Sequence, residues 1–324
     1  MPTWGEILEE LQSQPSVQQG GLPDFDTVRR KYLTRLFQLT ERPAIIYYSD
    51  FLAGGPAPGI DLSDMQAMME CCRGLGDDSV DLILHSPGGS AEATASIVRY
   101  LRRQFSEIRV FVPLAAMSAA TMWALSADRI VMGKHSQLGP IDPQLITPQG
   151  AVPARAVIEQ FERASEECSQ DPTRLGAWMP ILQQYGPALL EQCARAEELA
   201  RALVSEWLSK YMLGSRDNRE ADAERAADFF ADYGQHRSHA LGIDRDQGRA
   251  AGLLIDDLEE GAELQDAVLS VHHAALHTLR GPCAKLVENH LGRGIFQLQQ
   301  QSVVQLPIQL PQQVPPASAL AGSG

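Results

Sequence analysis

The chain reads His85-Ser86-Pro87-Gly88-Gly89 directly after one strand-like run, and Ala116-Met117-Ser118-Ala119-Ala120 directly after another. The second stretch also opens an apolar run that is typical of a helix. Two adjacent glycines let backbone N–H groups approach a ligand with no side chain in the way. A serine at the first turn of a helix lies beside unpaired N–H groups and the positive end of the helix dipole. Together the two stretches predict a nucleophile and the oxyanion hole that serves it.

The surrounding sequence alternates between short strands and helices. We expect strands at residues 44–48, 80–84, 109–112 and 129–132, with helices between them. Short strands separated by helices favour parallel pairing with right-handed crossovers, and therefore an α/β fold. Beyond about residue 153 the pattern becomes helical, at residues 154–168, 189–213, 218–232 and 262–279. Ser90 and Asp244 are placed to cap helices, and Asp61 or Ser63 is placed to cap a helix that runs to Cys72.

This pattern divides the chain into segments. Residues 1–42 read as an N-terminal helical segment that packs against the body or a neighbouring subunit. Residues 43–280 should form the α/β domain with its helical C-terminal part. No charged residue follows Arg293, and residues 294–324 are rich in Gln and Pro. We therefore expect a disordered tail that orders, if at all, on binding a partner.

Composition narrows the function classes. The chain has 324 residues, a net charge of −14 and no basic run, which argues against a nucleic-acid partner. Its five cysteines fit neither a disulfide framework nor a zinc site, so reduced thiols in the cytoplasm are expected. The longest apolar stretch, residues 110–125, is interrupted by Pro113 and predicts no membrane span. The acidic first residues do not read as a signal peptide.

Each motif taken alone has a structural interpretation. Pro87-Gly88-Gly89 is also what a tight turn between strand and helix requires. Ser118 alone is most simply a residue that caps a helix. The function rests on the combination of these motifs, not on any one of them.

Three segments in this order and spacing resemble the serine dehydrogenase proteinase family. That family is grouped with the Clp protease proteolytic subunits and signal peptide peptidase A in the crotonase-like superfamily. The resemblance runs from about Arg42 to His277, and the segments that carry it are Leu84-His85-Ser86-Pro87-Gly88-Gly89, Ala116-Met117-Ser118-Ala119 and Met132-Gly133-Lys134-His135-Ser136-Gln137-Leu138-Gly139-Pro140-Ile141-Asp142-Pro143-Gln144.

The resemblance implies a fold and a site. It implies a crotonase-like, Clp protease-type ββα-superhelix core with helical N- and C-terminal elaborations. Ser118 takes the place of the nucleophile, and Gly88 and Gly89 match the glycine pair of the oxyanion hole. The N–H of Ala119, next to the serine, could join them. Homo-oligomers are also implied, because relatives assemble into rings or stacked trimers.

The general base is where the chain departs from the family. Signal peptide peptidase A uses a lysine well after the serine, but this chain has no lysine between Lys134 and Lys210. Clp subunits use a histidine where this chain has Asp142. The remaining candidates are His135, Asp142, Lys134, and His236 or His239. We favour His135, whose ordinary pKa suits the task, with Asp142 as its partner or as a loop anchor.

The sequence thus predicts a serine endopeptidase that cleaves polypeptides through an acyl-enzyme on Ser118. No metal or organic cofactor is expected. One alternative is a crotonase-like enzyme that processes acyl-coenzyme A esters and does not need the serine. Another is an inactive binding or scaffold protein. Ala120, where relatives usually have glycine, and the unrecognised base favour the latter.

Overall fold

The computed structural model describes residues 3–13, 23–52, 58–147, 150–232, 242–281 and 283–298. At its centre is a seven-stranded sheet in the order β11-β10-β1-β2-β3-β5-β9. From β1 to β9 neighbouring strands are parallel, whereas β10 and β11 add an antiparallel edge. The strand bounds are β1 (Ala44–Ser49), β2 (Ser79–His85), β3 (Glu107–Val112), β5 (Arg129–Met132), β9 (Ile255–Asp257), β10 (Cys283–Asn289) and β11 (Gly294–Leu298).

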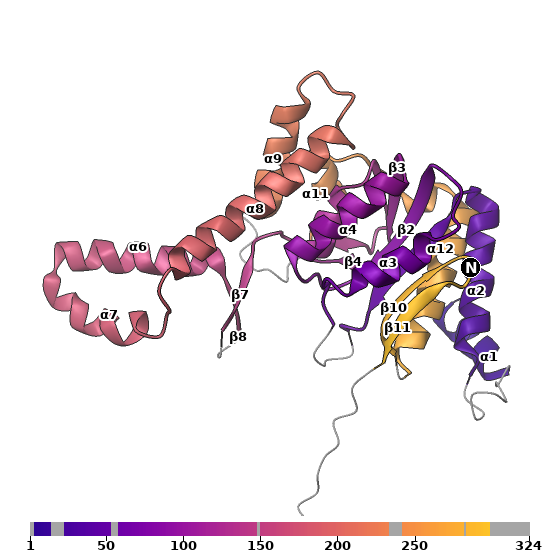
Figure 1. Ribbon diagram of the computed structural model, residues 1–324, viewed down its shortest axis with the longest axis horizontal. Helices are drawn as coiled ribbons and strands as arrows, with labels where there is room; N and C mark the ends of the chain where they lie inside the picture. Colours follow the sequence, from indigo (N-terminus) through magenta and orange to yellow (C-terminus); the bar gives the residue numbers. More distant parts are fainter. Residues whose placement is uncertain are drawn as a thin grey trace, which may run out of the picture.

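Helices cover both faces of this sheet. Side chains alternate along β1, so that Ile45 and Tyr47 enter one core while Ile46 and Tyr48 enter the other. The first core is covered by α3 (Asp64–Cys72), α4 (Ala91–Gln104), α5 (Ala119–Leu125), α8 (Leu189–Lys210) and α9 (Arg219–Ala231). The second is covered by α1 (Trp4–Ser13), α2 (Phe25–Thr40) and α12 (Ala262–Leu279), which gather on one side in Figure 1.

The helix N-caps can be compared with those that the sequence predicts. The Ser90 side chain accepts the Ala93 N–H at the start of α4. Asp244 forms a full capping box with Gln247 at the start of α11 (Arg245–Ala250). The caps predicted at Ser90 and Asp244 are confirmed, whereas Ser63 lies at the N-cap position of α3 without a capping hydrogen bond from its side chain.

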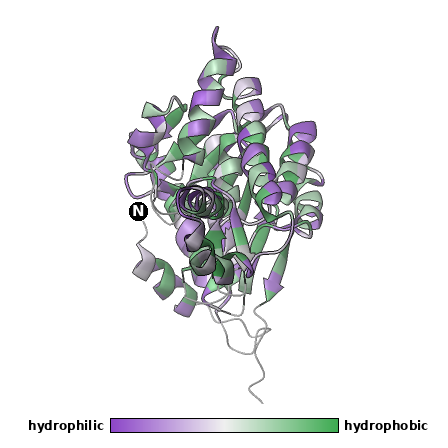
Figure 2. Ribbon diagram, turned by 90° about the vertical axis from the view of Figure 1, so that its left-hand side faces the viewer, coloured by the Kyte–Doolittle hydropathy of each residue, from purple (hydrophilic) through white to green (hydrophobic). Residues whose placement is uncertain are grey.

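An arm projects from the body. It consists of α6 (Ala154–Gln170), a short 3₁₀ turn η1 (Pro172–Arg174), α7 (Leu175–Leu182) and the first part of α8 (Figure 1). The hairpin of β7 (Gln144–Thr147) and β8 (Gly150–Pro153) leads into it. Figure 2 looks toward the arm and shows hydrophobic residues concentrated in the sheet and on the inner helix faces. Among the described residues, every helix is too short or too polar to cross a membrane.

The predicted α/β architecture with helical additions at both ends is confirmed. Three strands of the central sheet were not anticipated: β9 lies between predicted helices, and β10 and β11 lie beyond the predicted end of the domain at residue 280. Residues 294–298, assigned to the disordered tail, form β11, and residues 299–324 lie outside the described part of the chain. Lys285 and Glu288 interrupt the apolar pattern of β10, yet both are buried against partners on other elements.

The N-terminal helices share the second core with the sheet. Val28 and Leu33 of α2 belong to the same hydrophobic cluster as Ile46 of β1. Arg29 of α2 pairs with Glu288 of β10 at 2.7 Å, and both side chains are fully buried. Residues 25–40 are therefore integral to the packing of the α/β body.

Candidate active site

Ser118 lies in a strained turn. It connects β4 (Ala115–Ala116) to α5, and its φ of 51° and ψ of −122° are unusual for a residue with a side chain. Such strain costs on the order of 1–3 kcal/mol and is concentrated at functional sites. Its side chain makes no capping hydrogen bond and is partly exposed. The predicted role of Ser118 as a cap therefore does not explain its conformation.

Neighbouring hydrogen bonds impose this conformation. The Met117 N–H donates to the Ser86 carbonyl at 2.9 Å, which joins the two motifs. The Thr121 hydroxyl donates to the Ala116 carbonyl at 2.7 Å and accepts the Gly139 N–H at 2.8 Å. The turn is therefore fixed from both sides by buried polar contacts.

Gly88 packs directly against this turn. Its φ is +98°, and an added Cβ would lie 2.6 Å from the Met117 carbonyl oxygen and 2.8 Å from the Ser118 Cβ. Only glycine allows this approach. The Gly88 N–H donates to the Ser86 hydroxyl at 3.2 Å. The structure thus brings the glycine pair and the serine together, as the sequence predicts.

Among the backbone N–H groups at this point that have no hydrogen bond within the described part of the chain, two bear on the proposed chemistry. One is the Gly89 N–H and the other is the Ala119 N–H, at the first helical position of α5. Gly89, Ala119 and Ser118 line one pocket. Unpaired donors beside a hydroxyl, at the positive end of a helix, suit the stabilisation of a developing negative charge.

The pocket has a volume of about 460 Å³ and is of the size that binds a ligand segment. Its other walls come from the loop before α4, from α5, from the segment before β7 and from α8. The remaining lining residues are Pro87, Ser90, Ala91, Glu92, Met122, Ile141, Pro143, Gln144, Ala196, Leu199 and Ala200. Ile141, Pro143 and Ala200 also line a second, charged pocket beside the same turns of α8. The two pockets therefore adjoin.

Asp142 lies in the segment that borders this pocket. It is 2% exposed, and the Gln144 amide donates to its Oδ2 at 2.9 Å. Gly139, three residues earlier, is so close that an added Cβ would lie 3.1 Å from the Ser118 nitrogen. Burial chiefly raises the pKa of Glu197 on α8, and the Asp142 carboxylate adds to this rise.

His135 and Lys134 lie elsewhere. Both are exposed in the turn before β6 (Gln137–Leu138), at the opposite end of that strand from Gly139. His135 contributes to the lowered pKa of His272 on α12, although burial is the larger cause. The structure does not bring His135 together with Ser118. His236 and His239 lie outside the described residues.

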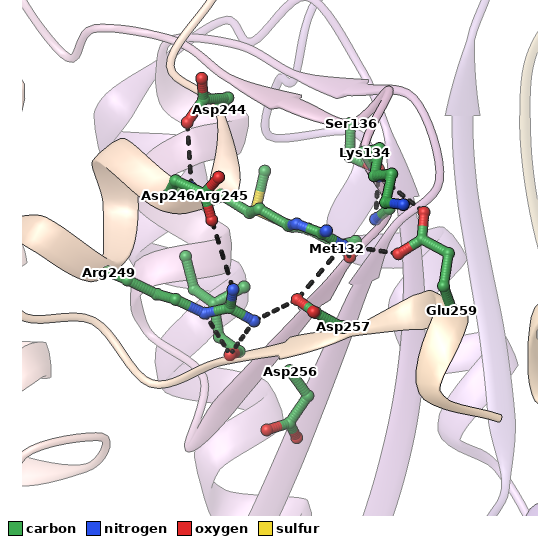
Figure 3. Close-up of polar contacts among 12 residues, drawn as sticks. Met132, Lys134, Ser136, Asp244, Arg245, Asp246, Arg249, Asp256, Asp257 and Glu259 are labelled. Atoms are coloured by element: carbon green, nitrogen blue, oxygen red, sulfur yellow. Dashed lines mark hydrogen bonds and ion pairs between the residues drawn. The ribbon is translucent and has the colours of Figure 1, made fainter.

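A network of charges surrounds the turn that carries Lys134 (Figure 3). The Lys134 N–H donates to Glu259 at 2.8 Å, and Glu259 also pairs with Arg245. Arg249 pairs with Asp257 of β9 and donates to the Ile255 carbonyl. These contacts fasten α11 and the 3₁₀ turn η2 (Leu258–Glu260) to the sheet, which is a structural role.

Comparison with known proteins bears on this site. Residues 58–179, which include the glycine pair and Ser118, match a known family. It is the ClpP-like SDH-type serine proteinase family. The resemblance inferred from the three sequence motifs is thereby confirmed. Asp142 and the arm up to α7 also fall within the matched segment of this proteinase family.

Two curated relatives come from Methanocaldococcus jannaschii. The uncharacterized protein MJ0137 is 36% identical over 115 residues, which are 35% of this chain and 39% of that protein. The uncharacterized protein MJ1495 is 34% identical over 163 residues, or 48% of this chain and 54% of that protein. The chain thus spans about half or less of the length of these relatives.

Among solved structures, two mutants of the 1510-N membrane-bound stomatin-specific protease are similar. One, in complex with a substrate peptide, is 16% identical with a TM-score of 0.37, covering 61% of this chain and 70% of that one. The other is 14% identical with a TM-score of 0.38, covering 64% and 79%. The likeness is weak at these scores, and no residue role follows from it.

Proposed function

We propose that the chain is a serine peptidase with Ser118 as its nucleophile. The observation that carries the proposal is the strained turn, which presents the Ser118 hydroxyl in a pocket beside the unpaired N–H groups of Gly89 and Ala119. The family match, which covers all three residues, supports the same role.

The proposed reaction proceeds through an acyl-enzyme. The Ser118 Oγ forms a bond to the peptide carbonyl carbon while a base accepts its proton. The carbonyl oxygen becomes an oxyanion, which the Gly89 and Ala119 N–H groups stabilise. The C–N bond then breaks, the leaving amine takes the proton, and water hydrolyses the acyl group by the reverse steps. Gly88 contributes its close packing, because its N–H already donates to Ser86.

We assign the role of base to Asp142 rather than to His135. Asp142 is buried in the segment whose Gly139 packs against the Ser118 turn, and its chain neighbours Ile141 and Pro143 line the pocket. A carboxylate can serve as the general base that accepts a serine proton. His135 lies in an exposed turn at the far end of β6.

The substrate we propose is an extended polypeptide. The pocket at Ser118 adjoins the second pocket along α8, which offers room for residues on one side of the cleaved bond. We also propose a homo-oligomer. Leu175, Met179 and Ile181 of the arm are exposed apolar residues that a second copy could cover. All five cysteines are free, which is consistent with the predicted cytoplasmic location.

Covalent labelling tests the proposal. A fluorophosphonate–rhodamine probe should label the wild type at one site and should not label Ser118→Ala. Fluorescein-labelled casein should be cleaved by the wild type only. Equal, poor labelling of both proteins would contradict a hydrolase and favour the scaffold alternative. A thermal shift with coenzyme A esters would favour the acyl-coenzyme A alternative.

A further inference from the structure

Lys285 is a buried lysine with a complete set of acceptors. Its side chain is 4% exposed, whereas that of Lys31 is 57% exposed and Lys134 and Lys210 also lie at the surface. The Nζ atom donates to the Gly59 carbonyl at 2.7 Å. It also donates to both Asp64 oxygens, at 2.9 and 3.0 Å.

Asp64, which accepts the Lys285 hydrogen bonds, also accepts hydrogen bonds from other groups. Asp64, at the start of α3, is 4% exposed. The Tyr47 hydroxyl donates to its Oδ2 at 2.8 Å, and the Asp61 N–H donates to the same atom at 3.0 Å. Burial chiefly raises the pKa of Tyr47, and Asp64 adds to this, so the phenol remains a donor at neutral pH.

Stability alone is a poor reason for such a pair. Removing two charges from water is costly, and replacing a buried ion pair by apolar residues is often neutral or even stabilising. A buried pair can instead select one conformation among alternatives. The contact with the Gly59 carbonyl indicates which conformation is selected here.

Gly59 leads directly to the glycine loop. The Ile60 N–H donates to the Gly88 carbonyl at 2.7 Å, and the Ser90 N–H donates to the Ile60 carbonyl at 2.8 Å. Gly59 and Gly89 both pack so tightly here that an added Cβ would meet backbone atoms, at 3.1 Å and 2.2 Å respectively. Residues 59–60 therefore hold the Gly88–Gly89 peptide in place through a hydrogen bond and close backbone packing.

The orientation of that peptide decides where its N–H points. The Gly88 carbonyl and the Gly89 N–H belong to one peptide group, and no cis peptide occurs in the described chain. In a trans peptide the C=O and N–H point in opposite directions. Because Ile60 holds the carbonyl, the Gly89 N–H is directed away from Ile60, on the side of the pocket that Gly89 shares with Ser118.

We propose that Lys285 and Asp64 are positioning residues for the oxyanion hole. The ion pair fixes Gly59, Gly59 fixes Ile60, and Ile60 holds the Gly88–Gly89 peptide with its N–H toward the substrate. Without the pair, the peptide can rotate and turn its carbonyl toward the oxyanion. This inference rests on the proposed function, since it assigns a role to groups behind the same site.

The chain offers a matched control on the same strand. Arg29 and Glu288 form another buried pair, and Glu288 is three residues from Lys285 on β10. The other partners of this pair lie on the other face of the sheet and not on residues 59–60: Arg30 of α2 donates to Glu288, and Arg29 donates to Thr278 of α12. The variants to compare are Lys285→Met with Asp64→Asn, and Arg29→Met with Glu288→Gln. Both remove a buried pair and leave no net charge behind.

Two measurements separate positioning from stability. The rate constant of fluorophosphonate labelling should fall about 10- to 100-fold in the Lys285/Asp64 variant, since a misplaced donor costs up to about 100-fold. The KM for labelled casein should stay within about twofold, as the pocket walls are unchanged. In hydrogen–deuterium exchange, the amides of Ile60 and Ser90 should lose protection in this variant only. The control variant should keep the wild-type labelling rate and the wild-type protection of these amides, even if its melting temperature falls.

Each outcome decides the matter. Wild-type labelling rates and amide protection in a folded Lys285/Asp64 variant would overturn the positioning role and leave the peptidase intact. Equal loss in the control would reduce the role to stability. A wild type that shows no Ser118-dependent labelling overturns the proposed function, and this inference with it. If the double variant does not fold, Asp64→Asn alone keeps the size and the acceptor atom, and the same comparison applies with a smaller fall.

Discussion

Gly88 packs so closely against Ser118 that there is no room for a side chain: a Cβ on Gly88 would lie 2.8 Å from the Ser118 Cβ. The serine turn and the glycine loop are therefore one rigid unit. This unit is what the proposed chemistry requires, because a displacement of about 1 Å at a reacting group can cost about 100-fold in rate.

Replacement of Gly88 by alanine should disrupt this unit. The added methyl must displace the Ser118 turn, so we expect labelling to fall by at least about 100-fold. Overpacking and the positive φ together should destabilise the fold by about 3 kcal/mol. Gly74→Ala is the control, because Gly74 also has a positive φ, +85°, but open space around its Cα. It should cost only about 1 kcal/mol and retain full activity, as urea unfolding and labelling would show.

Replacement of Ser118 should reveal the strain in its turn. The φ of 51° and ψ of −122° suit glycine but not residues with a Cβ. We expect Ser118→Gly to be more stable than Ser118→Ala by about 1 kcal/mol. Glycine relieves the backbone strain, and the entropy that glycine adds to the unfolded chain offsets part of this gain. Both variants should be inactive. Urea unfolding measures the difference, and a less stable glycine variant would show that the turn is not strained.

The two candidates for the base give opposite predictions. Asp142→Asn should lower the labelling rate by about 100-fold or more, because the amide cannot take the proton from the Ser118 hydroxyl. His135→Ala should stay within about twofold of wild type, since His135 lies in the distant turn. Asp228→Asn serves as a control, because Asp228 lines the adjoining charged pocket and is 55% exposed. The reverse ranking of Asp142 and His135 would restore His135 as the base.

His85 should make stability depend on pH. Burial lowers its pKa from the usual 6.5 to about 4, an effect that the Ala115 backbone partly opposes. The unfolded chain therefore binds the proton more tightly than the folded protein does. The free energy of unfolding therefore keeps its full value above about pH 6.5. It falls by about 3 kcal/mol in all as the pH drops toward 4, because the unfolded chain takes up the His85 proton first.

Urea unfolding between pH 7 and pH 4 measures this dependence. His272, whose pKa burial also lowers, adds to the same slope. The control is therefore the comparison of wild type with His85→Asn. The variant should reduce the slope of the unfolding free energy against pH by up to one proton, and the slope that remains should be the contribution of His272. An unchanged slope would mean that His85 titrates normally in the folded protein.

Much of the fold was predictable because its signals are local. The apolar runs of β1, β2, β3 and β5 alternate with helices, and the described structure has them in that arrangement. The adjacency of Gly88 and Ser118 was predictable too, because both follow neighbouring parallel strands, whose carboxyl ends meet at one edge of the sheet. The antiparallel edge was not, since buried Lys285 and Glu288 remove the apolar pattern from β10.

By itself, the sequence determined the class of fold and the elements that meet at the site, because periodicity and glycine placement act over a few residues. Only the tertiary structure decided which polar groups lie near Ser118. It set Asp142 beside the pocket, left His135 at the other end of β6, and placed Lys285 behind the glycine loop. The physical reason is that a charge becomes tolerable in the interior through partners that are distant in sequence, such as Asp64 for Lys285, and no local pattern encodes those partners.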